Sequence, residues 1–420
     1  MTGVRLGMAP GEVEVIDARV RSAVDRMLSV ASTVESVADR SVDPVGWLLG
    51  PGSIVIAPFS IASAHFAAAG TRAAASAAGE LIARLVGEVQ SQRDVSAPSR
   101  SFLTSMTASM WAGLLGIAAG GSSSRPAEAW RQVSAVWARL APVQRAAIVQ
   151  DFPERIAGLD GVPIVARVEA NRVLAARRLA DGVSSSAERE FLVSVVRGDT
   201  QLMLYEPEHE RIIEVVGAVD RPPEHIVTYV PGTGAELADL YDGSTQRVAR
   251  SLIDGEHAPD LVTLVYLDGP WITWVGERSN TAASFLSDRG AAVAHLSEVV
   301  AADPDWSGAK QHIVSHSAGT TVAAYAEVHG ARYQTFTSLA GSWLPSEWSA
   351  REGSRYLYLQ YGIDAIDALA LVSSTPFESS VFERTFLVPD DLSSDPAANH
   401  SLVASGTDEV KGAIVAHISK

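Results

Sequence analysis

The stretch Gln311–Thr320 constrains the fold of this chain more than any other part of it. A short apolar run ends there in small residues, and a helical segment follows. A strand, a tight turn with a Ser, here Ser317, and a helix are the parts of a nucleophile elbow. The turn strains the backbone at the Ser, so only small residues fit two positions before and after it. Ser315 and Gly319 stand there, although Gly is usual at the first position. The pattern predicts an elbow at Ser317.

From about residue 200 onward, β-rich runs alternate with helical segments. Besides the elbow strand, strands are predicted at Gln201–Tyr205, Arg211–Val216, His225–Val230, Leu261–Leu267, Gln334–Leu339 and Arg355–Tyr361. Helices are predicted at Ser244–Asp254, at Ala282–Ala302, after the elbow and at the C-terminus. The first two strands suggest a hairpin. Strands that alternate with helices indicate an α/β fold, with a mostly parallel sheet covered by helices.

The first half of the chain has the pattern of helices. Residues 11–40 place apolar side chains at steps of three and four, and an Ala-rich helical stretch runs from about 61 to 95. Further helices are expected at Pro126–Leu140, Pro142–Asp151 and Pro163–Asp181. We therefore expect an α-helical N-terminal region at 1–125, a helical segment at 126–199 packed on the sheet domain, and the α/β domain at 200–420. The apolar stripe of the N-terminal helices packs internally or binds a helical partner.

Charge and composition exclude several functions. The formal net charge is −16, and the only Lys residues are Lys310, Lys411 and Lys420. Such a surface repels phosphate backbones, which argues against nucleic acid as a partner. The absence of Cys excludes a thiolate nucleophile and disulfides. The N-terminus lacks the pattern of a secretory signal, and two uncharged windows, 44–71 and 101–124, are too interrupted to favour a transmembrane segment. The expected location is cytoplasmic, or outside the cell by export without a classical signal peptide.

Three loops, at the predicted carboxyl ends of the strands or near the C-terminus, carry a candidate nucleophile, acid and base. Ser317 is the candidate nucleophile, Asp364 follows the last predicted strand, and His400 lies near the C-terminus. A Ser hydroxyl needs a His to take its proton and a carboxylate to hold that His in the correct tautomer. The order Ser, acid, His is that of an α/β-hydrolase triad, so we expect that fold. Asp367 is an alternative acid and His417 an alternative base.

Such a site also needs two backbone N–H groups to bind the oxyanion of a tetrahedral intermediate. Ala318, directly after the nucleophile, is expected to supply one of them. Thr233 or its neighbour is expected to supply the other, because Gly232 and Gly234 let that loop approach closely.

Two patterns near these residues could instead indicate a cofactor or a metal. The Gly-Thr-Gly at 232–234 resembles the start of a dinucleotide fingerprint, but Leu237 occupies the third Gly position. His312 and His316 have a spacing seen in zinc sites, but they lie on a predicted strand, where this spacing does not reproduce a helix face. We therefore expect no cofactor and no metal ion.

Four Trp residues follow two of the predicted strands. Trp271 and Trp274 come after one strand, and Trp343 and Trp348 come after another. If both loops open at the carboxyl edge of the sheet, these Trp form an apolar pocket wall for a neutral ester, with Asp268 beside them. The alternative is that they fill the gap between the sheet and the helical region.

Taken together, the motifs resemble those of the DUF1023 family of actinobacterial α/β-hydrolases. The matching segments are Leu159–Arg172, Val230–Gly234, Tyr266–Pro270, the elbow around Ser317, the loop at Asp364, and His400 with Ser401. The family pattern has Gly-His-Ser-x-Gly and Asp-Pro-Val where this chain has Ser-His-Ser-Ala-Gly and Asp-Ala-Ile. The resemblance implies hydrolysis of esters or lipids, and an N-terminal helical region reminiscent of WXG100-type secretion substrates.

The expected function is therefore that of a serine esterase or lipase-like enzyme that uses an acyl-enzyme intermediate. The substrate is expected to be a small ester or a lipid. The alternative is an idle hydrolase fold that serves as a partner-binding or secreted interaction protein.

Overall fold

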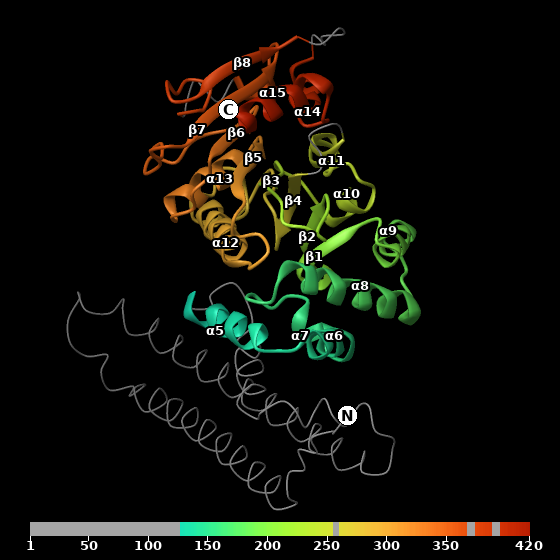
Figure 1. Cartoon of the computed structure of the whole chain (residues 1–420). Helices are drawn as coiled ribbons and strands as arrows, with labels where there is room; N and C mark the ends of the chain where they lie inside the picture. The colour runs from blue at the N-terminus through green and yellow to red at the C-terminus, as the bar shows by residue number, and fades with distance from the viewer. Residues whose placement is uncertain (1–126, 255–259, 368–373, 389–394) are drawn as a thin grey trace, which may run out of the picture. The chain divides into compact units, whose positions relative to one another are not determined.

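The computed structural model describes residues 127–254, 260–367, 374–388 and 395–420 (Figure 1). The chain divides into two compact units, Met1–Gln144 and Arg145–Lys420. This division falls inside the expected helical segment 126–199. The helical region expected at 1–125, with its helices at 11–40 and 61–95, lies outside the described residues.

Helices precede the sheet, as the sequence predicts. They are α5 (Ala127–Ala138), α6 (Pro142–Asp151), α7 (Pro153–Ile156), α8 (Ile164–Asp181) and α9 (Ser186–Arg197). The predicted helices correspond to α5, α6 and α8, whereas α7 and α9 were not predicted. The Ser185 hydroxyl caps the start of α9 by accepting from the Glu188 N–H, and Gly198 ends it in a left-handed conformation. Within the second unit, α8 packs against the first strand of the sheet.

Eight strands form one sheet in the order β1-β2-β4-β3-β5-β6-β7-β8. They are β1 (Gln201–Glu206), β2 (Arg211–Val216), β3 (His225–Val230), β4 (Leu261–Asp268), β5 (Lys310–His316), β6 (Thr335–Leu339), β7 (Arg355–Tyr361) and β8 (Glu383–Leu387). The β1–β2 hairpin and the β2–β4 pair are antiparallel, and the remaining pairs are parallel. This is the strand order of the α/β-hydrolase fold, as the sequence predicts. Only β8 was not predicted.

Helices cover both faces of the sheet (Figure 1). On one face α12 (Ala283–Ala302) packs along α13 (Gly319–Val328), and on the other α11 (Arg247–Ile253) packs along α15 (Asp408–Ser419). Two short helices, α10 (Leu237–Tyr241) and α14 (Pro396–Leu402), lie in loops, and a 3-10 turn, η3 (Pro207–His209), joins β1 to β2. Because both faces are covered, strands such as β4 are buried along almost their whole length.

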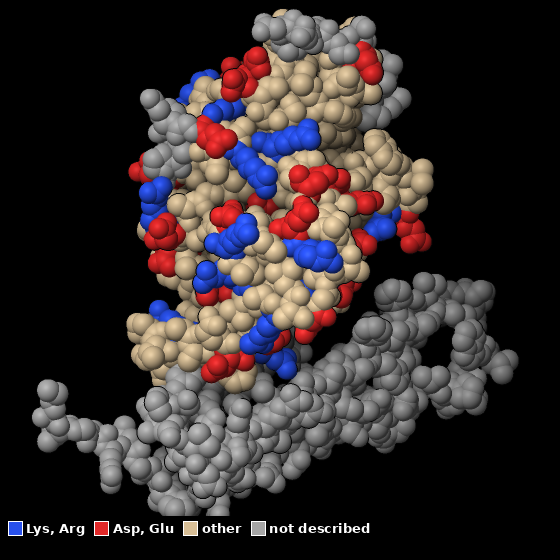
Figure 2. All heavy atoms as spheres, turned by 90° about the vertical axis from the view of Figure 1, so that its right-hand side faces the viewer, with Lys and Arg blue, Asp and Glu red and all other residues tan. Residues whose placement is uncertain are grey.

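The surface carries charges of both signs. On the face shown in Figure 2, basic and acidic side chains are interspersed. Ion pairs such as Arg177–Glu154 and Arg178–Glu208 join groups of opposite sign. The described part of that face therefore presents no continuous basic area of the kind that follows a phosphate backbone. In the part of the chain that the structure describes, no helix combines the length and the hydrophobicity of a membrane span.

The close contact between α12 and α13 predicts that one added methyl group, at Gly290, destabilises the protein. A Cβ on Gly290 would lie 2.3 Å from Tyr325 Cβ and 2.9 Å from Ala326 N, so Gly290→Ala must push the two helices apart. We expect the free energy of unfolding to fall by about 1–3 kcal/mol in urea titrations, as for other overpacked sites. Gly412→Ala, inside α15 with nothing within 4 Å, is the matched control and should raise it by up to about 1 kcal/mol. Equal effects of the two substitutions would contradict this account.

Candidate active site

Ser317 occupies a strained turn between β5 and α13. Its φ is 52°, in the left-handed region that a residue with a side chain rarely adopts. The conformation is held by main-chain hydrogen bonds on both sides. The Ser317 N–H donates to Leu339 O at 3.0 Å, and Ser317 O accepts from Thr320 N at 3.0 Å and from Ser342 N at 3.1 Å. The backbone therefore has the geometry of a nucleophile elbow.

The unusual Ser315 fits this turn because its hydroxyl is satisfied. Ser315 is fully buried, and its Oγ lies 3.0 Å from Thr320 Oγ1, which in turn lies 3.1 Å from Ser338 Oγ. A buried hydroxyl without a partner would cost stability, whereas this chain of hydroxyls pairs all three. The structure thus accommodates Ser at a position where the elbow pattern has Gly.

The loop that follows β3 lies directly against the elbow. A Cβ on Gly319 would lie 2.4 Å from Pro231 O, and a Cβ on Gly232 would lie 2.9 Å from His316 Nδ1 and 3.0 Å from Ser317 Cβ. The main-chain oxygen leaves no room for a Cβ at position 319, and a Cβ at position 232 would force the His316 ring to move. The predicted proximity of the Gly-Thr-Gly loop to the nucleophile is therefore seen in the structure.

Two backbone N–H groups near Ser317 are free to bind an oxyanion. Among the described residues, neither the Ala318 nor the Thr233 N–H donates a hydrogen bond. By contrast, the Gly234 N–H is used, because it donates to Ile272 O at 2.8 Å. The Thr233 hydroxyl is also buried without a partner in that part of the chain. Ala318 and Thr233 are the two residues that the sequence singles out for this role.

His400 and Asp364 form a hydrogen-bonded pair. His400 Nδ1 lies 2.7 Å from Asp364 Oδ1, and the Asp364 side chain is fully buried. The same oxygen accepts from the Ile366 N–H at 2.8 Å, which helps to hold the carboxylate in place. Asn399 Nδ2 donates to Ile363 O at 2.9 Å and thereby ties the His400 helix to the loop that carries Asp364. A Ser-His-Asp site needs this pairing to fix the His tautomer.

The two alternative residues lie in other arrangements. The Asp367 carboxylate accepts from Gln360 Nε2 at 3.0 and 3.1 Å and from the Asp364 N–H at 2.9 Å, so it holds the acid loop in shape. His417 Nε2 lies 3.3 Å from Arg355 O, at the first residue of β7, whereas Asp364 follows the other end of that strand. The structure brings His400 together with Asp364 and leaves Asp367 and His417 elsewhere.

His316, the residue before Ser317, contacts His400, whereas the sequence suggested for it only a zinc-like spacing with His312. The two rings lie 4.8 Å apart between centroids, and His316 Nε2 lies 3.0 Å from His400 O. Burial lowers the pKa of His316 to about 3, and the neighbouring His400 contributes to this lowering. The neutral ring therefore donates to the His400 carbonyl and places His400 beside the elbow. Its position next to the nucleophile was the available signal.

The described contacts do not include a hydrogen bond between the Ser317 hydroxyl and the His400 ring. In free enzymes such hydrogen bonds are often long and shorten when substrate binds.

The expected wall of four Trp is not formed. Trp271 is only 3% exposed, and its Nε1 donates to Gly232 O at 2.9 Å, so it supports the loop from the core. Trp348 Nε1 donates to Glu327 Oε2 at 2.7 Å, and its ring packs on Tyr356 near the start of β7, at the other edge of the sheet. The prediction was wrong for these two because position after a strand does not fix the direction of a side chain.

The other predicted pocket residues are placed differently. Trp274 is 72% exposed, and its Nε1 would lie 3.6 Å from a Cβ on Gly234, so it borders the loop. Trp343 is half-buried and donates from Nε1 to Asn280 O at 2.8 Å. Asp268 is tied to Arg211 by an ion pair, which leaves it a structural role at the end of β4.

Comparison with known proteins adds little to this geometry. No family model matches the chain, and no curated protein does. Among solved structures, TT1662 from Thermus thermophilus is 13% identical with a TM-score of 0.31, covering 50% of this chain and 92% of its own. XC6422 from Xanthomonas campestris, described as an α/β serine hydrolase without a lid, is 16% identical with a TM-score of 0.32, covering 50% and 88%. A carboxylesterase from Mesorhizobium loti is 12% identical with a TM-score of 0.33, covering 49% and 96%. Scores this low carry no argument about activity, and the hydrolase fold follows from the strand order and the elbow.

The lowered pKa of His316 predicts a pH-dependent contribution to stability. Below the ordinary pKa of about 6.5, the unfolded chain takes up a proton that folded His316 does not bind until about pH 3. Its contribution to the free energy of unfolding is therefore present above about pH 6.5 and is lost as the pH falls towards 3. His316→Gln keeps a donor for the His400 carbonyl but cannot titrate. The stability difference between wild type and this variant should shrink across that window in urea titrations, and a constant difference would contradict the assignment.

Proposed function

We propose that this protein is a serine hydrolase that cleaves carboxylic esters through Ser317, His400 and Asp364. The observation that carries the proposal is the 2.7 Å hydrogen bond between His400 and buried Asp364, set beside a Ser held at φ 52°. Neither a Ser in a strained turn nor a His–Asp pair is specific evidence for hydrolysis by itself, because each is common in proteins. Their combination, with two free N–H groups on the adjoining loops, is what acyl transfer requires.

The reaction would proceed in two steps. His400 takes the proton from the Ser317 hydroxyl as its oxygen attacks the ester carbonyl, and Asp364 stabilises the resulting imidazolium. The N–H groups of Ala318 and Thr233 bind the oxyanion of the tetrahedral intermediate. The C–O bond to the alcohol then breaks, and the alcohol leaves with the proton from His400. Water repeats the sequence on the acyl-enzyme, which releases the acid and restores Ser317.

The surroundings of these residues favour an ester with an apolar group. Trp274, which borders the oxyanion loop, and Ile363, which precedes Asp364, are each 72% exposed. Exposed large apolar side chains on both sides of a site are suited to contact an apolar acyl or alcohol group. Membership of the DUF1023 family belongs to the same proposal, because the motifs that resemble that family contribute the loop, the elbow and the His–Asp pair.

Labelling with a fluorophosphonate tests whether Ser317 is activated. We expect the wild-type protein to be labelled and to hydrolyse p-nitrophenyl acetate, and Ser317→Ala to lose both while its circular dichroism is unchanged. Ser287→Ala is the matched control, because Ser287 Oγ lies 2.9 Å from His329 Nε2 but stands on a helix without an elbow. Label on Ser317→Ala would refute the assignment. A folded wild type that takes no label would instead favour an idle hydrolase fold that binds a partner.

Substituting Asp364 and Asp367 one at a time distinguishes the proposed catalytic acid from the carboxylate that supports its loop. Asp364→Asn should lower kcat for p-nitrophenyl acetate by about 10³–10⁴-fold, because an amide favours the wrong His tautomer. Asp367→Asn should lower kcat by less than about tenfold, since its carboxylate contacts Gln360 and the Asp364 N–H rather than His400. The reverse ranking would show that Asp367 is the acid.

A further inference from the structure

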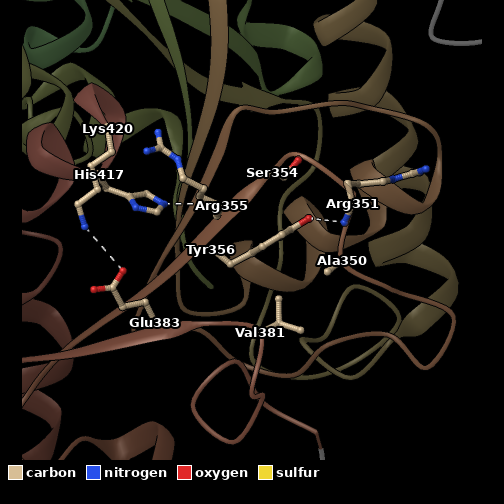
Figure 3. Close-up of a pocket in the computed structure, with 9 residues that line it drawn as sticks. All are labelled: Ala350, Arg351, Ser354, Arg355, Tyr356, Val381, Glu383, His417 and Lys420. Carbon is tan, nitrogen blue, oxygen red and sulfur yellow. Dashed lines mark hydrogen bonds and ion pairs between the residues drawn. The ribbon is translucent and has the colours of Figure 1, made fainter.

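A concave site lies at the other edge of the sheet from the proposed active site. A pocket of about 330 Å³ is formed where β7 and β8 begin and α15 ends (Figure 3). Its lining includes Arg355, Tyr356, Val381, Glu383, His417 and Lys420. Arg355 is the first residue of β7, whereas Asp364 follows the last, so the strand separates the two sites. The volume is within the range of about 300–1,000 Å³ that is usual for small-molecule sites.

Arg355 contributes to this pocket a guanidinium that has no partner among the described residues. In the part of the chain that the structure describes, its guanidinium makes no hydrogen bond and no ion pair, although the residue is half-buried. Arg351 differs, because its guanidinium donates to Glu327 O and is directed away from the other lining residues (Figure 3). A guanidinium presents a planar fork of donors that matches a carboxylate.

The charges that face the pocket leave a positive excess. Lys420 Nζ lies 3.8 Å from Glu383 Oε2, but these side chains are 60% and 65% exposed, and such pairs are weak. His417 is neutral, because burial lowers its pKa, and the charges of Arg355 and Lys420 add to this while Glu383 opposes it. Apart from Arg351, the lining side chains thus include two cations, Arg355 and Lys420, against the one carboxylate of Glu383, in a chain whose net charge is −16.

The opposite wall of the pocket is apolar. The Tyr356 hydroxyl already accepts from the Arg351 N–H at 2.7 Å and donates to Glu327 Oε1 at 3.1 Å. Tyr356 lines the pocket with only 5% of its surface exposed and offers no free polar group, because its hydroxyl is already paired. Val381, 41% exposed, lies beside it in the lining.

We propose that this pocket binds a small organic carboxylate. Its carboxylate pairs with Arg355 and Lys420, and its apolar body packs against Tyr356 and Val381. Because the pocket is remote from Ser317, the inference does not depend on the proposed esterase activity. Removing the Glu383 charge should strengthen binding, since this carboxylate competes with the ligand for Lys420.

Sodium benzoate is a suitable probe. Its binding can be measured by calorimetry and by the change in the NMR signals of the His417 ring at constant pH. We expect saturable binding to one site that shifts the His417 signals. Arg355→Gln should weaken binding at least tenfold, and Glu383→Gln should strengthen it severalfold. Arg384→Gln is the matched control and should change nothing, because its guanidinium lies over the Phe377 ring and donates to Phe377 O at 3.1 Å. Ester hydrolysis should be the same in all three variants.

Several outcomes would overturn the proposal. No binding of benzoate to the wild type, or equal affinity in Arg355→Gln, would do so. If benzamide binds as tightly as benzoate, the negative charge of the ligand does not contribute to binding. If inorganic phosphate binds as tightly as benzoate, the apolar wall does not contribute. If Arg355→Gln fails to fold, Glu383→Gln still decides the question, since its exposed side chain can be changed without loss of packing.

Discussion

The arrangement of the site depends on the close approach of three backbone segments around Ser317. A left-handed conformation at a residue with a side chain costs about 1–3 kcal/mol, so the surroundings must enforce it. Here Leu339 and Ser342 bind the Ser317 main chain from the β6 side, while Gly232 and Gly319 allow the loop after β3 to lie within contact distance. The contacts that stabilise the strained backbone of Ser317 also bring the free N–H groups of the two loops close to it.

Burial determines how the polar groups around this turn behave. Ser315, Thr320 and Ser338 are all fully buried and satisfy each other's hydroxyls. His316 remains neutral at physiological pH because burial lowers its pKa to about 3. A charged ring at this position would repel the imidazolium that the proposed mechanism forms on His400. The elbow therefore combines a strained backbone with a neutral, fully paired polar environment.

Strand β7 carries different chemistry at its two ends. The loop after its last residue presents Asp364 to His400, and its first residue, Arg355, lies in the pocket of Figure 3. Parallel strands place all their carboxyl ends at one edge of the sheet and all their amino ends at the other. The loop with Asp364 and the pocket with Arg355 therefore lie at opposite edges of the sheet, separated by the length of β7.

The sequence by itself determined seven of the eight strands and the longer helices α8, α12 and α13 in their order, because the periodicity of apolar residues is local. It located the elbow at Ser317, the fold class, and both residues of the His400–Asp364 pair. It missed β8, since Glu383–Leu387 lies at the edge of the sheet and is mostly exposed, without the pattern of a buried strand. Only the tertiary structure shows that Asp364 pairs with His400 whereas Asp367 pairs with Gln360, because the two carboxylates lie three residues apart on one loop and differ only in what they face. The Trp side chains were misplaced for the same physical reason: spacing along a chain predicts which edge of a sheet a loop reaches, but packing decides where each side chain points.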